Sequence, residues 1–594
     1  MGISKNWTIG AAFAALAVSS CVSPDSVEAS SAEAETPPFI DPVTLSQSMC
    51  SGQTPEARAA AARLNPGFDF SKPFALPAEV IGHFHYPVST ASREAQTWFD
   101  TGMAHMANFN HDEAIAAFRK AQAKDPGCAM CYWGEGLSFG SNINIPYAAE
   151  RGAAGLVATN KAIDLIDATL PPHEVALIEA LATRYSVADG EAVVENPGAF
   201  AEAMDTVALA HAGDKMILSL AAEANMDTQP WDYWQPGARE PKGRTARTLE
   251  LIEMALAIDP DFAPAIHLYI HITESSVDPF RAESYADRLL EQQLGVGHLV
   301  HMPSHIYLRL GKWKKSRTAN LSAIEADEAY IAASDNAAVY GSVYYPHNVH
   351  FVVASSQFAG DAETALDMAE KLEAMVVLDP AEPAPLAEHI AASPIFTDLI
   401  FSTEETILAT PEPAAKHLYM RTAWHYARGT ALARRGDLDA ASAELDELAA
   451  LTSAPGFADY DTAYFAPLSG IQAVAQLTLD GRLAAERGDL KTAIDRLESA
   501  AAAEAQLPYF EPTWWYYPTR QTLGLYLLQD GQYDRAEREF FKTLIKAPNN
   551  AYALYGLAET FKAKGDTRSE AYARSLFDEA WMGTDETVPK LDNL

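Results

Sequence analysis

The chain shows a recurring order of large apolar, small and polar positions whose spacing fits helices. Between residues 93 and 126 the fixed positions are Trp98, Gly102, Ala114, Phe118, Ala121 and Pro126. The last five follow Trp98 at offsets of 4, 16, 20, 23 and 28 residues. Two helices that cross closely need a small residue at the crossing and a large apolar one opposite, and a proline ends the second helix. The pattern therefore predicts paired antiparallel helices.

The same order returns three times toward the C-terminus. Its members are Gly429, Gly436, Ala441 and Leu445, then Gly481, Gly488, Ala493, Leu497 and Ala500, then Gly524, Gly531, Ala536, Phe540 and Pro548. These are the offsets of the tetratricopeptide (TPR) repeat, which is about 34 residues long. In the middle of the chain Gly311 and Gly360 are each expected at the turn between paired helices, which phases two further units. The period-two alternation typical of strands is rare. We predict an all-α, TPR-type solenoid of helical hairpins, a right-handed superhelix that is either continuous or divided into two stacked blocks.

Composition and repeat phasing divide the chain into five segments. The predicted order is a lipoprotein signal peptide at 1–21, a disordered tether and entry segment at 22–75, an N-terminal TPR block with a His-rich groove at 76–375, a Pro-rich connection at 376–415 and a C-terminal TPR block at 416–590. The tether begins with a stretch rich in Ser, Ala, Glu and Pro, which has little to bury.

The first 21 residues have the layout of a secretory signal. Lys5 precedes a run of small and apolar residues, and the run ends in Val18-Ser19-Ser20-Cys21, which resembles a bacterial lipobox. We expect Cys21 to be lipidated after export, so that its acyl chains anchor the protein in a membrane. Val22 stands where an Asp would favour the inner membrane, so we expect the outer membrane of the cell envelope, facing the periplasm.

The acidic composition of the chain limits its partners. Lys and Arg number 43 against 80 Asp and Glu, and the net charge is −37. Nucleic-acid binding needs clustered Lys and Arg that displace counterions from phosphates, so we predict no nucleic-acid partner. The sequence also lacks a nucleophilic triad, a phosphate loop and a dinucleotide motif. Whether the protein is an enzyme stays open, with metal-dependent catalysis as the remaining form.

Histidines gather in one stretch of the repeat array. The chain has 16, and seven lie between residues 267 and 350, where Glu274 also lies. They are His267, His271, His298, His301, His305, His347 and His350. His267 and His301 are 34 residues apart, as are His271 and His305, which is one repeat period. In the repeat frame the seven histidines and Glu274 take positions 2, 5, 9 and 12 of successive first helices, which face the concave groove of TPR proteins.

These eight side chains have the chemistry of a metal site. Packed helices lie about 8–10 Å apart, so imidazoles from neighbouring helices can share an ion at about 2.0–2.1 Å. Imidazole with a carboxylate suits Zn, Cu, Fe or Ni better than Mg or Ca. We predict a transition-metal site, with two ions, or one ion and outer histidines, as alternatives. A His-lined groove for a peptide or an anion, and a purely structural use of the histidines, stay open.

Three cysteines remain after Cys21, namely Cys50, Cys128 and Cys131. Cys128 and Cys131 form a CxxC pair, but no βαβ pattern surrounds it, and Tyr132 stands where haem attachment needs His. We expect structural cysteines in an oxidising compartment, with a disulfide from Cys50 to one of the pair as one alternative.

An aromatic cluster lies near the C-terminus. It contains Trp514, Trp515, Tyr516 and Tyr517, with Tyr509, Phe510 and Arg520 beside them. Such a cluster is more often apolar core between repeats, and the alternative is an aromatic platform in the groove formed by Trp514, Trp515 and Tyr517.

Several long strings resemble a family of exported bacterial TPR proteins. They are CAMCYWGEGLSFGSNIN, QPWDYW, AIHLYIHITE, GHLVHMPSHIYLRLGKW, YYPHNVHF and EPTWWYYPTRQTLG. The likeness spans roughly residues 80–560. The family is defined by its repeats and has no settled activity, so the resemblance implies a fold and export but no reaction.

Two functions fit these observations. The first is an envelope scaffold that holds a protein or peptide in its concave groove, with a structural or regulatory metal, because TPR arrays mostly work this way. The second is a metalloenzyme, a hydrolase or an oxidoreductase, in which the histidines leave one coordination position open and Glu274 acts as ligand or general base.

Overall fold

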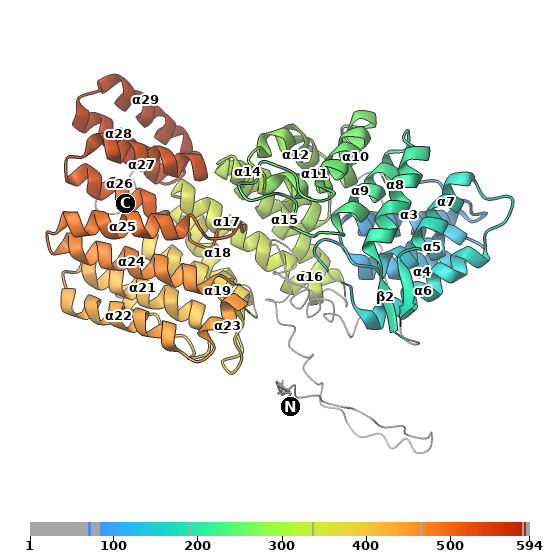
Figure 1. Cartoon of the computed structure of the whole chain (residues 1–594), viewed down its shortest axis with the longest axis horizontal. Helices are drawn as coiled ribbons and strands as arrows, with labels where there is room; N and C mark the ends of the chain where they lie inside the picture. The colour runs from blue at the N-terminus through green and yellow to red at the C-terminus, as the bar shows by residue number, and fades with distance from the viewer. Residues whose placement is uncertain are drawn as a thin grey trace, which may run out of the picture. The chain divides into compact units, whose positions relative to one another are not determined.

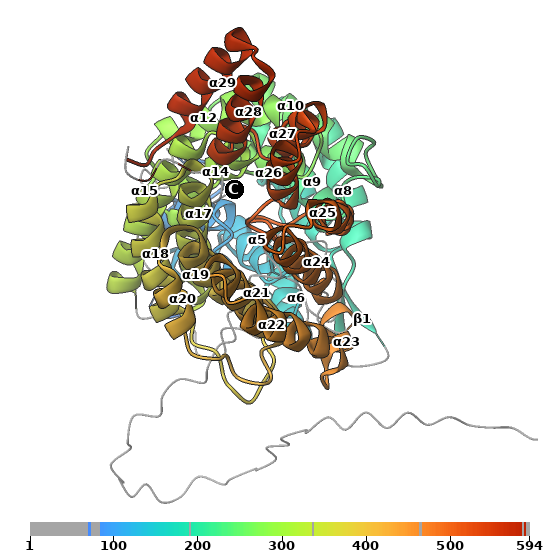
Figure 2. The same ribbon diagram turned by 90° about the vertical axis from the view of Figure 1, so that its left-hand side faces the viewer.

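A computed structural model describes residues 69–72, 84–145, 147–188, 192–334, 338–462, 466–584, 587 and 589. The expected signal peptide, Cys21, Cys50 and most of the expected tether lie outside these residues. The described secondary structure is almost entirely helical, as the sequence predicts. Consecutive helices lie side by side as hairpins through the array (Figure 1), and a view from the side shows the same stacking (Figure 2).

The elements fall into three consecutive groups. The first contains α3 (Arg93–Ala107), α4 (His111–Lys124), α5 (Ala129–Ser138), α6 (Ala149–Asp164), α7 (Pro172–Leu181), β1 (Tyr185–Ala188), β2 (Ala192–Glu195), α8 (Pro197–Ala210), α9 (Lys215–Met226) and α10 (Thr245–Ile258). The second contains α11 (Ala263–Glu274), η2 (Pro279–Ala282), α12 (Glu283–Glu291), α13 (Gly297–His301), α14 (Pro303–Arg309), α15 (Trp313–Ala333), α16 (Ala338–Ser342), α17 (Tyr344–Ala359) and α18 (Ala362–Met375). The third contains α19 (Pro385–Phe401), α20 (Glu404–Ala409), α21 (Leu418–Arg434), α22 (Leu438–Ala450), η3 (Leu451–Ser453), α23 (Phe457–Thr462), α24 (Leu468–Glu486), α25 (Leu490–Glu504), α26 (Thr519–Gln529), α27 (Tyr533–Lys546), α28 (Ala551–Lys564) and α29 (Thr567–Ala580).

In the regular hairpins a phenylalanine ring packs between two glycines of neighbouring helices. A Cβ added to Gly102 on α3 or to Gly134 on α5 would lie 2.6 Å or 2.4 Å from the ring of Phe118 on α4. Three helices therefore meet at one fully buried phenylalanine. Only glycine leaves room for this close approach, which explains the spacing seen in the sequence.

The same arrangement recurs near the C-terminus. There Phe540 on α27 is fully buried between Gly524 on α26 and Gly556 on α28, whose added Cβ atoms would lie 2.8 Å and 2.3 Å from its ring. The offsets of these three residues equal those of Gly102, Phe118 and Gly134 along the chain. The helices at the two ends of the array are therefore packed in the same way.

The turns of the middle hairpins lie where the sequence places them. Gly311, between α14 and α15, has a φ of +64°, and Gly360, which caps α17 before α18, has a φ of +76°. Both are left-handed conformations that glycine adopts without strain. After the second turn, the side chain of Asp361 accepts a hydrogen bond from the backbone N–H of Thr364 and caps α18.

Two segments differ from the sequence-based expectation. Residues 376–415 are not only a proline-rich connection, because α19 runs through Pro394 and α20 follows it. In addition, β1 and β2 form an antiparallel hairpin in register from Tyr185 with Glu195 to Ala188 with Ala192. Short strands of this kind escape a search for long periodic patterns.

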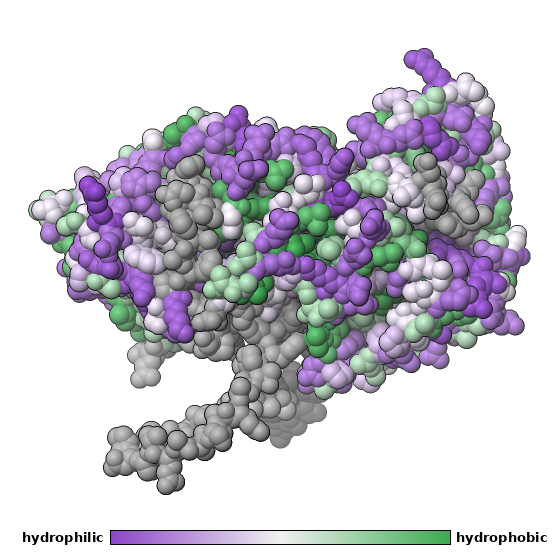
Figure 3. Space-filling view, turned by 180° about the vertical axis from the view of Figure 1, so that it is seen from behind, coloured by the Kyte–Doolittle hydropathy of each residue, from purple (hydrophilic) through white to green (hydrophobic). Residues whose placement is uncertain are grey.

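The apolar core continues across the expected boundary between the two blocks. One cluster of buried residues runs from Phe84 to Tyr516, so the described residues belong to one compact unit. Among the described residues, no helix combines the length and apolar character that a membrane crossing requires. Figure 3 shows one face on which hydrophilic residues cover most of the outside and hydrophobic ones gather near the middle.

Candidate metal centre

The predicted metal ligands come from four helices in the middle of the array. α11 carries His267, His271 and Glu274 on one face. α13 and α14 carry His298, His301 and His305, and α17 carries His347 and His350. The positions one repeat period apart therefore do come together in space, as the register predicts.

The burial of these residues differs from the prediction of an open groove. His267, His271 and His305 are each 1% exposed, and His301 is 0% exposed. The segment between α25 and α26 contacts this region, since Glu511 lies against His305 and Tyr516 against His350. The histidines are therefore buried rather than exposed to solvent, and this later part of the chain packs against them.

The first group of ligands contains His267, His271 and His298. Their candidate ligand atoms lie within 4.8 Å of one another. The Nε2 atoms of His267 and His298 are 3.1 Å apart. Two imidazole nitrogens bound to one tetrahedral zinc ion lie roughly 3.3 Å apart, so this spacing matches shared coordination.

The second group contains His301, His305 and His347, again within 4.8 Å. The Nε2 atoms of His301 and His305 are 2.9 Å apart. The rings of His271 and His305 have centroids 5.8 Å apart, so the two groups adjoin each other. The structure therefore divides the predicted patch into two neighbouring triads.

A carboxylate pair lies beside the two triads. Nδ1 of His305 is 2.6 Å from Glu274 Oε2 and 2.9 Å from Glu511 Oε2. Glu274 also accepts a hydrogen bond from His271 at 3.1 Å, so it links both triads. Glu511 is 206 residues from His305 in sequence, and sequence reasoning missed it. The only available signal was its place at the start of the aromatic string EPTWWYYP.

Hydrogen bonds fix the orientation of four imidazoles. Nδ1–H of His267 donates to the carbonyl of Ala107 (2.9 Å), and Nδ1–H of His301 donates to Asn320 Oδ1 (2.6 Å). The amide of Asn320 donates to the carbonyl of Ser316, which turns its oxygen toward His301. The Nδ1 atoms of His271 and His305 face carboxylates in the same way. Because Nδ1 carries the proton in the neutral rings of His267, His271 and His301, the Nε2 atom of each presents a lone pair to its neighbours.

Burial sets the protonation of most of these histidines. It lowers the pKa of His267 to about 3, and together with nearby imidazoles it holds the pKa values of His271 and His298 well below the usual value. The pKa values of His301 and His347 are lowered for the same reasons. Five neutral imidazoles therefore point their nitrogen atoms into this region at pH 7.

His305 differs from the other histidines. Burial alone would lower its pKa, but the adjacent carboxylates of Glu274 and Glu511 outweigh burial and raise the pKa to about 10. Burial also raises the pKa of Glu274 to about 7, against the opposing attraction of His305. Without an ion, the protonated His305 directs its Nδ1–H to the carboxylates and donates its Nε2–H to the Nε2 lone pair of His301.

His350 does not join either triad. Its Nε2 contacts the hydroxyl of Tyr516, and its ring lies 5.3 Å from that of His389. His389 in turn hydrogen-bonds the hydroxyl of Tyr419 at 2.9 Å. Of the eight predicted ligands, seven lie in the triads or their carboxylate link, and His350 belongs to a separate buried His–Tyr network.

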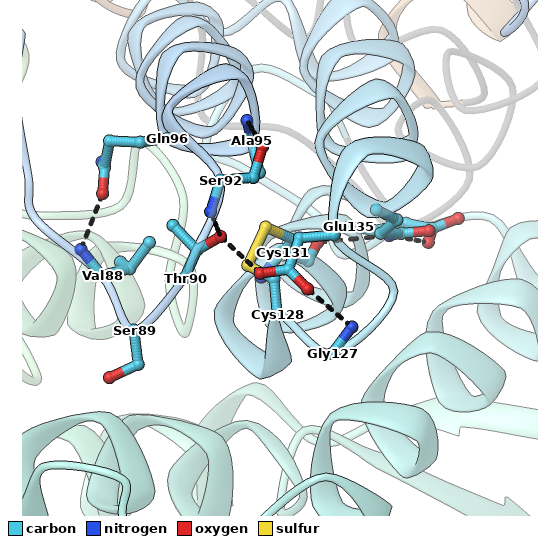
Figure 4. Close-up of a disulfide and its surroundings, with 12 residues drawn as sticks. Val88, Ser89, Thr90, Ser92, Ala95, Gln96, Gly127, Cys128, Cys131 and Glu135 are labelled. Atoms are coloured by element: carbon cyan, nitrogen blue, oxygen red, sulfur yellow. Dashed lines mark hydrogen bonds between the residues drawn. A yellow bond between two sulfur atoms is a disulfide. The ribbon is translucent and has the colours of Figure 1, made fainter.

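The CxxC pair forms a disulfide at the start of α5. Cys128 is joined to Cys131, so the alternative of a bond from Cys50 to one of them does not hold (Figure 4). Cys128 also caps α5, since its sulfur accepts a hydrogen bond from the backbone N–H of Cys131. Both residues are fully buried, which fits a structural role.

The aromatic cluster belongs to the core. Trp514, Trp515 and Tyr517 are buried, and the ring of Trp515 packs on Tyr426 and Phe396. These contacts favour the interpretation as apolar packing between repeats, although Trp515 also lines a cavity.

Comparisons with known proteins agree with the repeat. Residues 95–128 match the family described as tetratricopeptide repeat. This match covers α4 and most of α3, the hairpin that Phe118 holds together. The fold is thus an all-α, TPR-type solenoid. Folds of this class commonly serve as scaffolds for protein partners.

Solved structures with a related arrangement have low similarity. The structure titled human IFIT1 dimer with m7Gppp-AAAA is 11% identical with a TM-score of 0.29, covering 83% of this chain and 91% of that one. The P58(IPK) TPR domain is 13% identical with a TM-score of 0.22, covering 80% and 99%. TM-scores this low carry no argument about function. The comparison with curated proteins gives no match.

Proposed function

We propose that this protein is a TPR-type scaffold whose core is held by one or two transition-metal ions. The observation that carries the proposal is the orientation of the imidazoles. Four Nδ1 atoms are fixed by acceptors, so three Nε2 lone pairs, and a fourth once His305 gives up its second proton, converge in a fully buried region. Like lone pairs repel at close range, and a shared cation removes that repulsion.

The donor set indicates which ions fit. His267, His271 and His298 would hold one ion, and His301, His305 and His347 a second. Neutral imidazole with nearby carboxylate suits Zn, Cu, Fe or Ni. Glu274 and Glu511 would orient the ligands and balance the charge of the ion, as carboxylates beside metal-bound histidines commonly do.

Complete burial favours a structural or regulatory metal over an open catalytic one. The ligands come from α11, α13, α14 and α17, and Glu511 comes from the segment before α26. Metal binding would therefore join the middle of the array to its C-terminal part. A structural ion stabilises the native fold directly, because the unfolded chain has no preformed site.

The first test is elemental analysis of protein purified without a His tag. After exposure to Zn, Cu, Fe, Ni and Mn and extensive dialysis, we expect one or two ions per chain. The double variant with His271→Ala and His305→Ala should lose high-affinity binding, because it removes one ligand from each triad. A wild-type chain that retains no stoichiometric metal overturns the proposal.

A matched control separates ligand loss from general damage. His417 and His425 are also buried, but His417 bonds to the backbone carbonyl of Asp379 and His425 to the carboxylate of Glu444. The double variant with His417→Ala and His425→Ala should keep its metal. If both double variants lose metal equally, the loss reflects unfolding, and cobalt absorption spectra of the wild type then decide whether imidazole ligands surround the ion.

The second candidate is a metalloenzyme, and one observation favours it. A cavity of about 250 Å³ is lined by Glu511, the carboxylate that contacts His305. A substrate bound there would reach the edge of the centre without opening the core. Turnover that needs the metal and is lost in Glu511→Gln while the ion stays bound would favour the enzyme over the scaffold.

We also propose that the chain is exported and anchored through Cys21. The support comes from the lipobox-like string at residues 18–21 alone. The variant Cys21→Ser should move from the membrane fraction to the soluble envelope fraction, and membrane association that persists in this variant would contradict the anchor.

A further inference from the structure

A cavity of about 250 Å³ lies where the middle helices meet the C-terminal ones. Leu308, Arg309, Trp313 and Phe358 line it from α14, α15 and α17. α25, α27 and the segment before α26 supply the remaining walls. This volume is near the lower end of pockets for small molecules, and it is too small for a helix or a folded partner.

The walls of the cavity combine apolar surface with positive charge. The rings of Trp313 and Phe358 stack with centroids 4.8 Å apart. Four basic residues line the cavity, Arg309, Arg520, Lys542 and Lys546, against two acidic ones, Glu504 and Glu511. A basic majority is unusual in a chain with a net charge of −37, so it points to an anionic ligand.

Both acidic side chains are already engaged. Glu504 accepts hydrogen bonds from the backbone N–H and the hydroxyl of Thr519, and Glu511 contacts His305. Among the described residues neither carboxylate forms an ion pair with a basic side chain of the cavity, although Glu504 still attracts Arg520 and Lys546.

The basic side chains of the cavity outnumber the carboxylates that pair with them. Arg520 and Lys542 share one carboxylate, that of Glu539. Lys546 is exposed and forms no ion pair within the described part of the chain. The two lysines thus leave positive charge at the exposed side of the cavity.

One residue that lines the cavity has a buried donor without a partner. Trp515 is 1% exposed, and its Nε1–H has no hydrogen-bond partner among the described residues. An indole N–H that is buried without an acceptor is costly, so a ligand oxygen at this position would be stabilising. This observation is independent of the charge.

We propose that this cavity binds a small aromatic carboxylate that carries a second oxygen acceptor. The carboxylate would lie at Lys542 and Lys546, the ring would pack against Trp313 and Phe358, and the second oxygen would accept from Trp515. The site goes beyond the proposed metal centre and does not depend on it, although Glu511 borders both.

Isothermal titration with 3-(4-hydroxyphenyl)propionate tests the proposal on the full-length protein. We expect a dissociation constant on the order of 10⁻⁴ M, as suits a ligand of about a dozen heavy atoms. The corresponding amide, which lacks the charge, should bind about tenfold more weakly. Absence of binding at millimolar concentration, or equal binding of acid and amide, overturns the proposal.

Variants locate the ligand within the cavity. Lys546→Gln and Trp515→Phe should each weaken binding about five- to tenfold, since one removes the charge and the other the donor. Lys562→Gln, on the surface of α28 beside Glu559, should leave binding unchanged. Unchanged binding in both cavity variants contradicts the site.

The same titration separates this site from the metal centre. It is run on metal-loaded and on chelator-treated protein, with elemental analysis of both. Ligand binding without any retained metal would contradict the proposed centre and keep the cavity. Retained metal without ligand binding would contradict the cavity alone.

Discussion

The C-terminal hairpins and the middle of the array are built from the same helical repeat but bury different chemistry. At the C-terminus, the ring of Phe540 fills the space between Gly524 and Gly556. In the middle, imidazoles and carboxylates from α11, α14 and α17 occupy the interior. Apolar packing needs only the right volume, whereas buried polar groups need protons, partners or an ion in the right place. We therefore expect the C-terminal region to be insensitive to pH and metal, and the middle region to respond to both.

The largest expected effect is a steep loss of stability of the metal-free protein in acid. His267, His271, His298, His301 and His347 have lowered pKa values when folded but return to about 6.5 when unfolded. Below pH 6.5 the unfolded chain therefore binds protons that the folded chain does not, so stability is present above that pH and is lost below it. Each histidine contributes about 1.4 kcal/mol per pH unit.

Glu274 opposes this trend. Its raised pKa gives the folded chain one extra proton between about pH 4.5 and 7, and that of His305 gives another between about pH 6.5 and 10, so the loss begins only below pH 6.5 and approaches about 5.5 kcal/mol per pH unit. Urea unfolding at pH 7.5 and 5.5 measures the change. Hydrogen exchange at pH 5.5 should open α11 and α14 before α26–α28, which follow the last histidine of the chain. An equal free energy of unfolding at both pH values would contradict the comparison.

A core truncation in the regular region should be large but independent of pH and metal. Phe540→Ala leaves a cavity among three helices and should cost about 3–5 kcal/mol of unfolding free energy. The neighbouring Phe541 is 45% exposed, so Phe541→Ala should cost little. We expect the cost of Phe540→Ala to be the same in chelator and in zinc. A cost that changes with metal would mean that the two regions are coupled.

The smallest expected effect concerns Glu511, a carboxylate that contacts His305 although it is distant from it in sequence. Glu511→Gln keeps the shape but removes the charge beside His305, and it should weaken metal binding about 10- to 100-fold. Glu498→Gln, at an exposed ion pair with Arg535, is the control and should have no effect on metal affinity. Metal competition with a chromophoric chelator measures both variants. Equal affinities would remove Glu511 from the site.

The fold was predictable because the repeat is local. Glycine, alanine and proline at fixed offsets set the helix pairs, and the turns at Gly311 and Gly360 confirm the phasing of the middle. The β1–β2 hairpin and the helices within residues 376–415 were missed, because short elements and a proline inside a helix do not follow the repeat. Local patterns specify hairpins, not the segments inserted between them.

The candidate centre was predictable in part. Register alone brought His271 close to His305, whose ring centroids are 5.8 Å apart, since residues one period apart lie on adjacent helices. Register could not reveal burial, because what covers a groove depends on where later segments pack. Glu511 and His389 were missed for this reason, and His350 was assigned to the wrong network.

The contact between His305 and Glu511 has a consequence for the order of assembly. Synthesis delivers the histidines of α11 to α17 first, and domains generally begin to fold from the N-terminal side. Until residue 511 arrives, His305 lacks one of its two carboxylates and the centre lacks its cover. Closing a loop of 206 residues is slow compared with forming a hairpin. A chain that ends before residue 511 therefore leaves its imidazoles open to water and other proteins. The centre can be completed only after synthesis has passed this residue.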